Sequence, residues 1–256
     1  MKKLFGLLPI ALLLCTAFFA QAQTAEDIVA KYLAQTGGDN WAKLKTIKMS
    51  AKVKMQGQEL PVTMLQKAPN AQKIMFVFQG KEITQLSFDG KEGWSTNFMT
   101  MKAEKMEAED SENMANDQDV PDTFFEYAKK GYKIALEGEE TVEGAACHKI
   151  KVTKKPTKVD GKEEENVTFY FFDKENNVPI MTRSTVKKGQ GKGATVETLL
   201  SDYQEVSGVF FPFTITVKYN GQVGQSIVMD KVETNVEISD KDFAFPADVP
   251  AEVKKN

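Results

Sequence analysis

Histidine and cysteine are almost missing from this sequence. Its 256 residues include one histidine, His148, and two cysteines, Cys15 and Cys147. A zinc site needs three or four ligands from cysteine, histidine and carboxylates, and the first two are nearly absent. Neighbouring residues of a strand point to opposite faces, so Cys147 and His148 cannot share a metal or form a nucleophile pair. We predict no metal and no cofactor.

The motifs of phosphate sites and of serine hydrolases are absent as well. The glycine-rich run 189–193 leads into Thr195–Leu199, which is typical of a strand, whereas a phosphate cradle needs a helix N-terminus there. No Gly-x-Ser-x-Gly elbow occurs. The 36 acidic residues leave a carboxylate pair for hydrolysis open as a minor alternative. We predict that the chain is not an enzyme.

The N-terminus has the layout of a cleavable export signal. Two lysines precede the apolar run 4–19, which ends at Ala20-Gln21-Ala22, so we expect cleavage after Ala22. The run is shorter than the about 20 apolar residues that cross a bilayer. A lipoprotein signal at Cys15 is the rival interpretation, but bulky Leu13 and Leu14 precede that cysteine, where small residues are usual.

The remaining residues, 23–256, suffice for one β domain with its own core. They contain 31 basic and 36 acidic side chains, and this negative balance argues against nucleic acid as a partner. They contain no second long apolar run, so we expect no stable membrane insertion. Cys147 is their one cysteine, which excludes an intramolecular disulfide.

Alternation of apolar and polar residues dominates the chain after one short helix. The helix is predicted from Thr24, a capping residue with Asp27 three positions on, to Gly37-Gly38. From Ile47 onward, period-two alternation and Gly or Asn turns recur at the spacing of a meander. We predict a mainly β protein, with a single antiparallel sheet of about ten or eleven strands and a few helices.

The segment 102–122 interrupts this pattern. It carries eight acidic residues and two lysines, and it shows no alternation. Its composition favours a helix or a mobile loop inserted at the rim of the sheet. A solvated surface excursion is an equally weighted interpretation, because runs of charge usually face water.

Soft apolar side chains are abundant, with 17 phenylalanines and 11 methionines. Many fall on alternate strand positions, which an ordinary core would explain. The sharper hypothesis is a curved sheet whose concave face stays partly empty for a lipid-like ligand, lined by adaptable methionines. The candidate lining residues are Met49, Val53, Met55, Phe76, Phe78, Leu86, Phe88, Trp94, Phe98, Met99, Met101, Met106, Phe124, Phe169, Phe171, Phe211 and Phe213.

Several short stretches resemble a known group of proteins. They are Thr36-Gly37-Gly38 with Trp41, Leu60–Met64, Gln66–Asn70, Phe88–Trp94, Val142–Gly144, Lys149–Thr153, Ser201–Val206, Phe211–Phe213 and Phe243–Pro246. These are similar to exported proteins of Bacteroidetes-type bacteria described as outer-membrane lipoprotein-sorting proteins, in the LolA/LolB-like superfamily. The resemblance covers essentially all of 23–256, and its motifs are turns and strand edges.

The resemblance implies an unclosed half-barrel with helices across its concave face, and 102–122 as a lid-like insertion. It implies a periplasmic carrier or holder of lipid or of lipoprotein acyl chains. Carriers of this group gate their lid with an arginine near the early strands, whereas the one arginine here, Arg183, lies in a late strand. An interaction or sensor module with a filled core, which would bind another envelope protein, remains the alternative.

Overall fold

The computed structural model describes residues 23–55 and 57–246. The predicted leader and its cleavage site lie outside the described residues. The first half of the described chain contains α1 (Ala25–Thr36), the 3-10 turn η1 (Gly38–Lys43), β1 (Thr46–Met55), β2 (Gln58–Lys67), β3 (Ala71–Phe78), β4 (Lys81–Phe88), β5 (Gly93–Asn97), β6 (Lys102–Lys105) and α2 (Ala108–Asp117). The second half contains β7 (Lys133–Val142), β8 (Ala145–Thr153), β9 (Thr157–Val159), β10 (Lys162–Glu164), β11 (Val167–Asp173), β12 (Pro179–Thr185), β13 (Thr195–Val206), β14 (Val209–Tyr219), β15 (Gln222–Thr234) and η2 (Asp240–Asp242).

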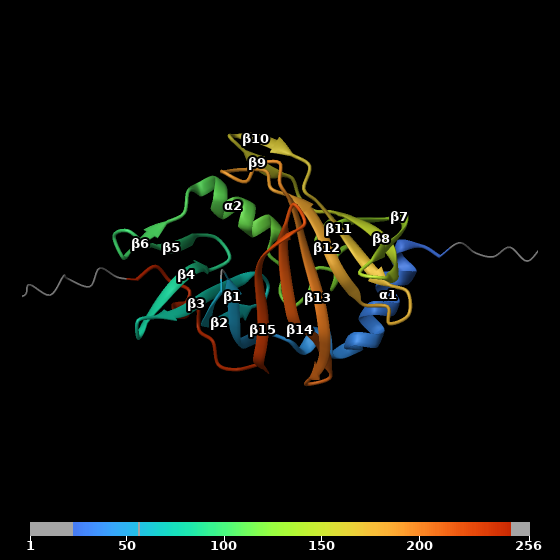
Figure 1. The fold of residues 1–256 in the computed structure, drawn as a ribbon, viewed down its shortest axis with the longest axis horizontal. Coiled ribbons are helices and arrows are strands. Elements are labelled where there is room, and N and C mark those ends of the chain that lie inside the picture. The colour runs from blue at the N-terminus through green and yellow to red at the C-terminus, as the bar shows by residue number, and fades with distance from the viewer. Residues whose placement is uncertain (1–22, 56, 247–256) are drawn as a thin grey trace, which may run out of the picture.

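The first helix begins and ends where the sequence predicts. Thr24 Oγ1 accepts the backbone N–H of Asp27 at 3.1 Å, and Asp27 accepts the N–H of Thr24 at the same distance, which completes a capping box. Ile28, Val29 and Tyr32 form its buried stripe. The helix thereby packs its apolar side onto the sheet near β7 and β8 (Figure 1).

One antiparallel sheet of 13 strands forms the body of the protein. Its order is β6-β5-β4-β3-β2-β1-β15-β14-β13-β12-β11-β8-β7. Nearly all neighbours are consecutive in sequence, apart from the junctions of β1 with β15 and of β8 with β11. The edge strands β6 and β7 do not pair with each other, so within the described residues the sheet wraps round without closing (Figure 1).

The predicted number of ten or eleven strands is too low. Part of the missing count lies in 102–122, whose first four residues form β6 and pair with β5. A second hairpin, β9 and β10, forms a separate two-stranded sheet around Asp160-Gly161. These short strands are rich in charge and lack an apolar face, so alternation does not identify them.

Successive hairpins place alternate turns at opposite ends of the strands. We call one end the rim: it carries the turns at Gly57, 79–80, 98–101, 186–194 and 220–221. We call the other end the base: it carries the turns 68–70, 89–92, 143–144, 174–178 and 207–208. The largest cluster of buried apolar side chains includes the α1 stripe, Phe172 and Phe211.

Candidate functional site

The concave face is filled near the base. Strand pairing places Val62, Ala51 and Met229 side by side across β2, β1 and β15, and all three are buried. Phe124, from the segment after α2, is fully buried against Phe172 of β11 with ring centroids 5.3 Å apart. Helix α1 and this segment therefore supply the side chains that complete the core over this part of the sheet.

The same face continues toward the rim without such cover. The next row of paired residues crosses five strands and consists of Leu60, Val53, Ile227, Ile215 and Leu200. All five side chains are apolar, and all five are only partly buried. Beyond this row, which we call the open row, Met55, Phe78 and Tyr219 end their strands in exposed positions. The sheet thus presents a continuous apolar surface that the described residues leave partly open.

Helix α2 crosses from one side of the curved sheet to the other (Figure 1). At one side, Ser111 Oγ accepts the backbone N–H of Gly93, at the start of β5, at 3.1 Å. At the other side, the amide of Asn113 makes two hydrogen bonds of 2.7 Å with the backbone of Lys158 in β9. The segment 102–122 therefore joins β5 and β6 to the β9–β10 hairpin.

The acidic side chains of α2 have basic partners from distant parts of the chain. Lys188, in the turn after β12, lies 2.9 Å from Asp110 and 3.1 Å from Glu109. Glu109 also accepts the backbone N–H of Gly161 at 2.7 Å, and this bond together with Lys188 lowers the pKa of its carboxyl. Hydrogen bonds to Asp110 and Glu109 raise the pKa of Lys188. These contacts stabilise α2 only while the acids are charged.

The end of α2 is fastened by a more buried pair. Lys154 Nζ lies 2.8 Å from Asp119 and 3.3 Å from Asp117. Burial lowers the pKa of Lys154, but the charges of Asp117 and Asp119 outweigh that effect and raise it overall. The ammonium group therefore stays charged at neutral pH, and it anchors the exit of α2 to the end of β8.

Two hollows flank α2. One, of about 540 Å³, lies between the helix and the turn after β4, where Gly90, Gly93, Met106 and Ala115 line it. The other, of about 300 Å³, lies between the helix and β11–β12, where Met114, Val167 and Ser184 line it. The helix is therefore loosely packed on both sides and is held chiefly by hydrogen bonds and ion pairs.

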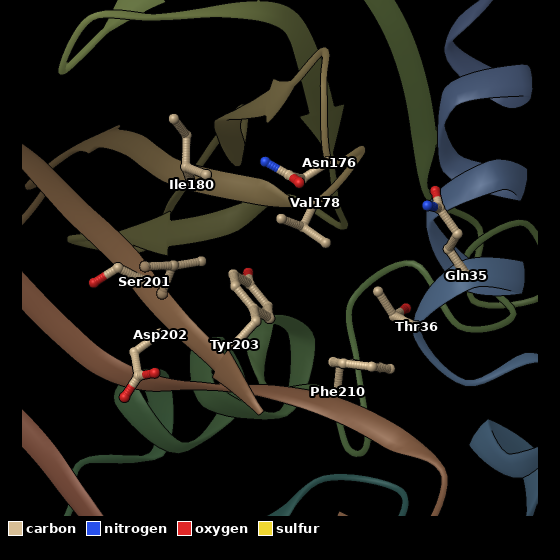
Figure 2. Close-up of a pocket in the computed structure, with 10 residues that line it drawn as sticks. Gln35, Thr36, Asn176, Val178, Ile180, Ser201, Asp202, Tyr203 and Phe210 are labelled. Atoms are coloured by element: carbon tan, nitrogen blue, oxygen red, sulfur yellow. The ribbon is translucent and has the colours of Figure 1, made fainter. Parts of the chain in front are cut away.

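A lateral cleft, which Leu200 of the open row also lines, opens where β12 and β13 diverge. Their pairing stops at Met181 and Leu199, and Asp202, with a left-handed φ of 54°, interrupts the ladder of β13 with β14 between Ser201 and Tyr203. Tyr203 spans the gap by donating its hydroxyl to the carbonyl oxygen of Pro179 at 2.6 Å. Figure 2 shows the Tyr203 ring between Val178 and Phe210, with Gln35 and Thr36 of α1 on the far side.

This lateral cleft continues toward a buried carboxyl group. Its outer hollow, of about 450 Å³, shares Leu200, Tyr203 and Phe210 with an inner hollow of about 280 Å³ that reaches Asp122. Burial raises the pKa of Asp122, which accepts the Tyr32 hydroxyl at 3.0 Å and the N–H of Phe124 at 2.7 Å. These bonds occupy both carboxyl oxygens, so Asp122 serves to position the segment after α2.

The structure separates the predicted lining residues into four groups. Met49, Val53, Met55, Phe76, Phe78 and Leu86 share the concave face, and Met106 lines a hollow beside α2. Phe88, Phe124, Phe211 and Phe213 are buried and belong to the packed interior. Trp94, Phe169 and Phe171 lie on the other face of the sheet. Phe98, Met99 and Met101 lie in the turn between β5 and β6 and are exposed.

The residues on the other face have local partners of their own. Phe171 is fully buried with Cys147 and Met181 in a second cluster, and the Arg183 guanidinium lies 4.7 Å from its ring centroid. Trp94 donates its indole N–H to the carbonyl oxygen of Phe243 at 2.9 Å. The C-terminal segment therefore covers Trp94, and these side chains do not share a surface with the open row.

Sequence reasoning missed most of the open row. Ile215 and Val217 continue the alternation that begins at Phe211 and Phe213, so the same signal could have identified them. Ile227 and Leu200 become visible only once the register with β14 is known. The basic partners of α2 gave no signal, because Lys188 is 79 residues from Glu109 in the chain.

The one histidine and the buried cysteine sit apart from these features. Cys147 packs in the second cluster, and burial raises the pKa of its thiol. Burial likewise lowers the pKa of His148. Among the described residues, no group of three or more His, Cys, Asp or Glu side chains is arranged to hold a metal ion. No described helix is long and apolar enough to cross a membrane.

Solved structures with a similar fold include proteins from three bacteria. A DUF1329 family protein from Desulfovibrio piger is 14% identical, covers 85% of this chain and 95% of its own, and has a TM-score of 0.53. A LolA superfamily protein from Nitrosomonas europaea is 12% identical, with 87% and 98% covered and a TM-score of 0.53. A domain from Vibrio parahaemolyticus described as an outer membrane lipoprotein-sorting protein is 10% identical, with 85% and 94% covered and a TM-score of 0.54.

Sequence comparison adds no relative. No protein family matches the chain, and no curated protein is detectably similar to it. At 10–14% identity the structural likeness concerns the fold. The chain has the unclosed, curved antiparallel sheet of LolA superfamily and lipoprotein-sorting proteins.

Proposed function

We propose that this protein holds an apolar ligand, the acyl chain of a lipid or of a lipoprotein, against the open row of its concave face. It acts as a non-catalytic carrier or holder in the periplasm of a Gram-negative envelope. The resemblance of the sequence to exported proteins of Bacteroidetes-type bacteria supports this proposal.

The open row is the observation that carries the proposal. Five apolar side chains on five adjacent strands form one surface, and each remains partly exposed although a packed core lies directly beside it. Monomeric soluble proteins rarely leave contiguous apolar surface open without a use for it. Each buried methylene contributes about 0.8 kcal/mol, so roughly ten methylenes would contribute about 8 kcal/mol without covalent chemistry.

Helix α2 supplies a way to cover and release the ligand. It crosses the curved sheet between two hollows and is fastened by ion pairs of Lys188 and Lys158 with its acidic side chains. Exposed ion pairs contribute little and reform readily, so the helix can detach without unfolding the core. In this role 102–122 is a lid, as the resemblance implies.

The setting of the chain supports an envelope role. Its first 22 residues read as an export signal, and proteins with its fold include one described as lipoprotein-sorting.

The non-catalytic assignment is supported by the pairing of the buried acids. Asp119 is held by Lys154 and Lys130, and Asp122 by Tyr32 and backbone N–H groups, so neither is positioned as a free acid or base.

A charge placed in the open row tests the proposal. Ile227→Glu puts a carboxylate on the concave face, whereas Val228→Glu puts it on the opposite, exposed face of the same strand. With a dansyl-labelled undecanoic acid as probe, I227E should bind at least about tenfold more weakly and V228E as well as the wild type. Equal affinities in all three proteins would refute the assignment of the open row.

A second pair of variants separates the open row from the lateral cleft. Val217→Trp fills the concave face beyond Ile215, and Ile180→Trp fills the outer hollow of the cleft. We expect V217W to displace the probe and I180W to retain it, and the reverse would move the site to the cleft. Native mass spectrometry of protein purified without detergent should show a co-purified lipid. A complete lack of bound lipid and of probe binding would favour a filled interaction module.

A further inference from the structure

Exposed apolar side chains gather at one end of the sheet. The described residues include ten large hydrophobic side chains that are exposed: Met55, Val77, Phe78, Phe98, Met99, Met101, Tyr219, Val223, Val228 and Phe245. The first eight lie in the rim turns or at the strand ends that flank them, and only Val228 and Phe245 lie elsewhere. The base turns have no counterpart to this grouping.

The turn between β5 and β6 contains the most exposed of these side chains. Met99 is 95% exposed, and its neighbours Phe98 and Met101 are 58% and 52% exposed. Asn97 holds the turn by accepting the backbone N–H groups of Met99 and Thr100 at 2.9 and 3.1 Å. Phe98 contacts Phe76 of β3, with ring centroids 5.9 Å apart. The turn is therefore a braced apolar tip that adjoins the concave face.

Charge at the rim is basic in the turns themselves. The five rim turns contain three lysines, all in 186–194, and no acidic residue. Lys81 and Lys102 each follow directly after a rim turn, and within the described residues neither they nor Lys192 form an ion pair. Of the flanking acids, Glu59 is paired with Lys54, and Glu104 accepts the Asn97 amide. The connection from β8 to β11, at the same end of the sheet, contains four lysines and four acidic residues, and its hairpin contacts α2.

We propose that the rim docks on the surface of a lipid bilayer that contains anionic lipid, with Phe98, Met99 and Met101 entering the interface. Apolar side chains enter the boundary between headgroups and acyl chains, while nearby lysines contact anionic headgroups. Met55, Phe78 and Tyr219 connect this tip to the open row, so a docked protein would present its concave face to the membrane. The inference rests on the proposed function only in making the bilayer the source or destination of the ligand.

Vesicle co-sedimentation tests the inference with the chain that begins at Gln23, so that the apolar leader cannot bind by itself. Vesicles contain phosphatidylethanolamine and phosphatidylglycerol in equal parts, or phosphatidylcholine alone. We expect binding to the anionic vesicles that weakens as salt is raised, and weaker binding to phosphatidylcholine. The triple variant Phe98→Ser, Met99→Ser, Met101→Ser should bind at least about tenfold more weakly.

The control removes exposed apolar side chains that lie away from the rim. The double variant Val228→Ser, Phe245→Ser should bind vesicles like the wild type, and both variants should keep the urea midpoint of the wild type. An equal loss of vesicle binding in the control variant overturns the inference. Failure of the wild type to bind either kind of vesicle also overturns it and would assign the rim to a protein partner. The fatty-acid probe separates the two proposals, because the triple variant should still bind it.

Discussion

The base and the rim of the sheet are built from the same alternating strands, yet they differ in what covers them. At the base, α1 and the segment around Phe124 fill the concave face, and Phe124, Phe172 and Val209 are fully buried. Toward the rim the apolar positions continue on β1, β3 and β14 and end in exposed residues. Alternation therefore specifies which way a side chain points, whereas burial depends on what the rest of the chain places opposite.

This difference assigns separate tasks to the two regions. The packed base supplies the free energy of folding, and a large apolar side chain lost there leaves a cavity. The rim half contributes less to folding and retains apolar surface that can be used for binding. Substitutions of the same chemical type should therefore affect stability at the base and ligand or membrane binding at the rim.

Truncating one phenylalanine in each region should give the largest contrast. Phe172→Ala removes a fully buried ring that packs on Tyr32 and Phe124, and we expect it to lower the free energy of unfolding by about 3–5 kcal/mol. Phe78→Ala removes a ring that is 46% exposed and should cost less than about 1 kcal/mol. Urea unfolding measures both. Similar losses in the two variants would mean that the rim is part of the core.

Enlarging a side chain should destabilise the protein at the base and leave its stability nearly unchanged toward the rim. Ala51 is buried between Val62 and Met229, so Ala51→Phe should overpack the base and cost about 1–3 kcal/mol. Val217→Phe adds similar bulk to the partly open part of the same face and should change stability by less than about 0.5 kcal/mol. V217F should nevertheless weaken binding of the fatty-acid probe. A destabilised V217F would show that its surroundings are already filled.

Sequence reasoning predicted a mainly β, antiparallel fold with too few strands and placed several residues of the concave face, and its failures have definite physical causes. The register that aligns Leu60, Val53 and Ile227 depends on pairing between β1 and β15, which are about as far apart in the chain as two strands can be. Phe169 and Phe171 obey the same alternation as Phe211 and Phe213, but their strand is in the opposite phase, and they meet Cys147 on the other face. Periodicity cannot assign the phase of one strand relative to another.

The acidic segment shows a second limit. Its composition favoured a helix or a mobile loop, with a solvated excursion equally open, whereas its first four residues form the edge strand β6. Lys154, Lys158 and Lys188 determine where α2 lies: the first two come from the connection of β8 to β11, and Lys188 comes from the turn after β12. Electrostatic partners across such distances leave no local pattern in the sequence.

Removing one hydroxyl from each region gives a smaller test. Tyr32→Phe deletes the hydrogen bond to the buried carboxyl of Asp122 and should cost about 1 kcal/mol or somewhat more. Tyr219→Phe at the rim removes a hydroxyl from a side chain that is 46% exposed, and water satisfies its partners, so no change is expected. Urea midpoints compare the two variants. An unchanged Y32F would mean that water replaces the lost donor inside the inner hollow.

Lowering the pH should loosen the attachment of helix α2 and leave the base of the sheet folded. The pKa of Glu109 is lowered in the folded protein, first by the Gly161 N–H and then by Lys188. Its contribution is therefore fully present above the unfolded pKa of about 4.3 and is lost as the pH falls through the lower folded value. Hydrogen-exchange protection, corrected for the intrinsic rate, should fall in α2 below about pH 4 while β14 keeps its protection. Glu109→Gln should loosen α2 in the same way at neutral pH, because the amide lacks the charge that Lys188 pairs with. A parallel loss in β14 would identify global unfolding, and unchanged protection of α2 in E109Q would show that Asn113 and Ser111 alone hold the helix in place.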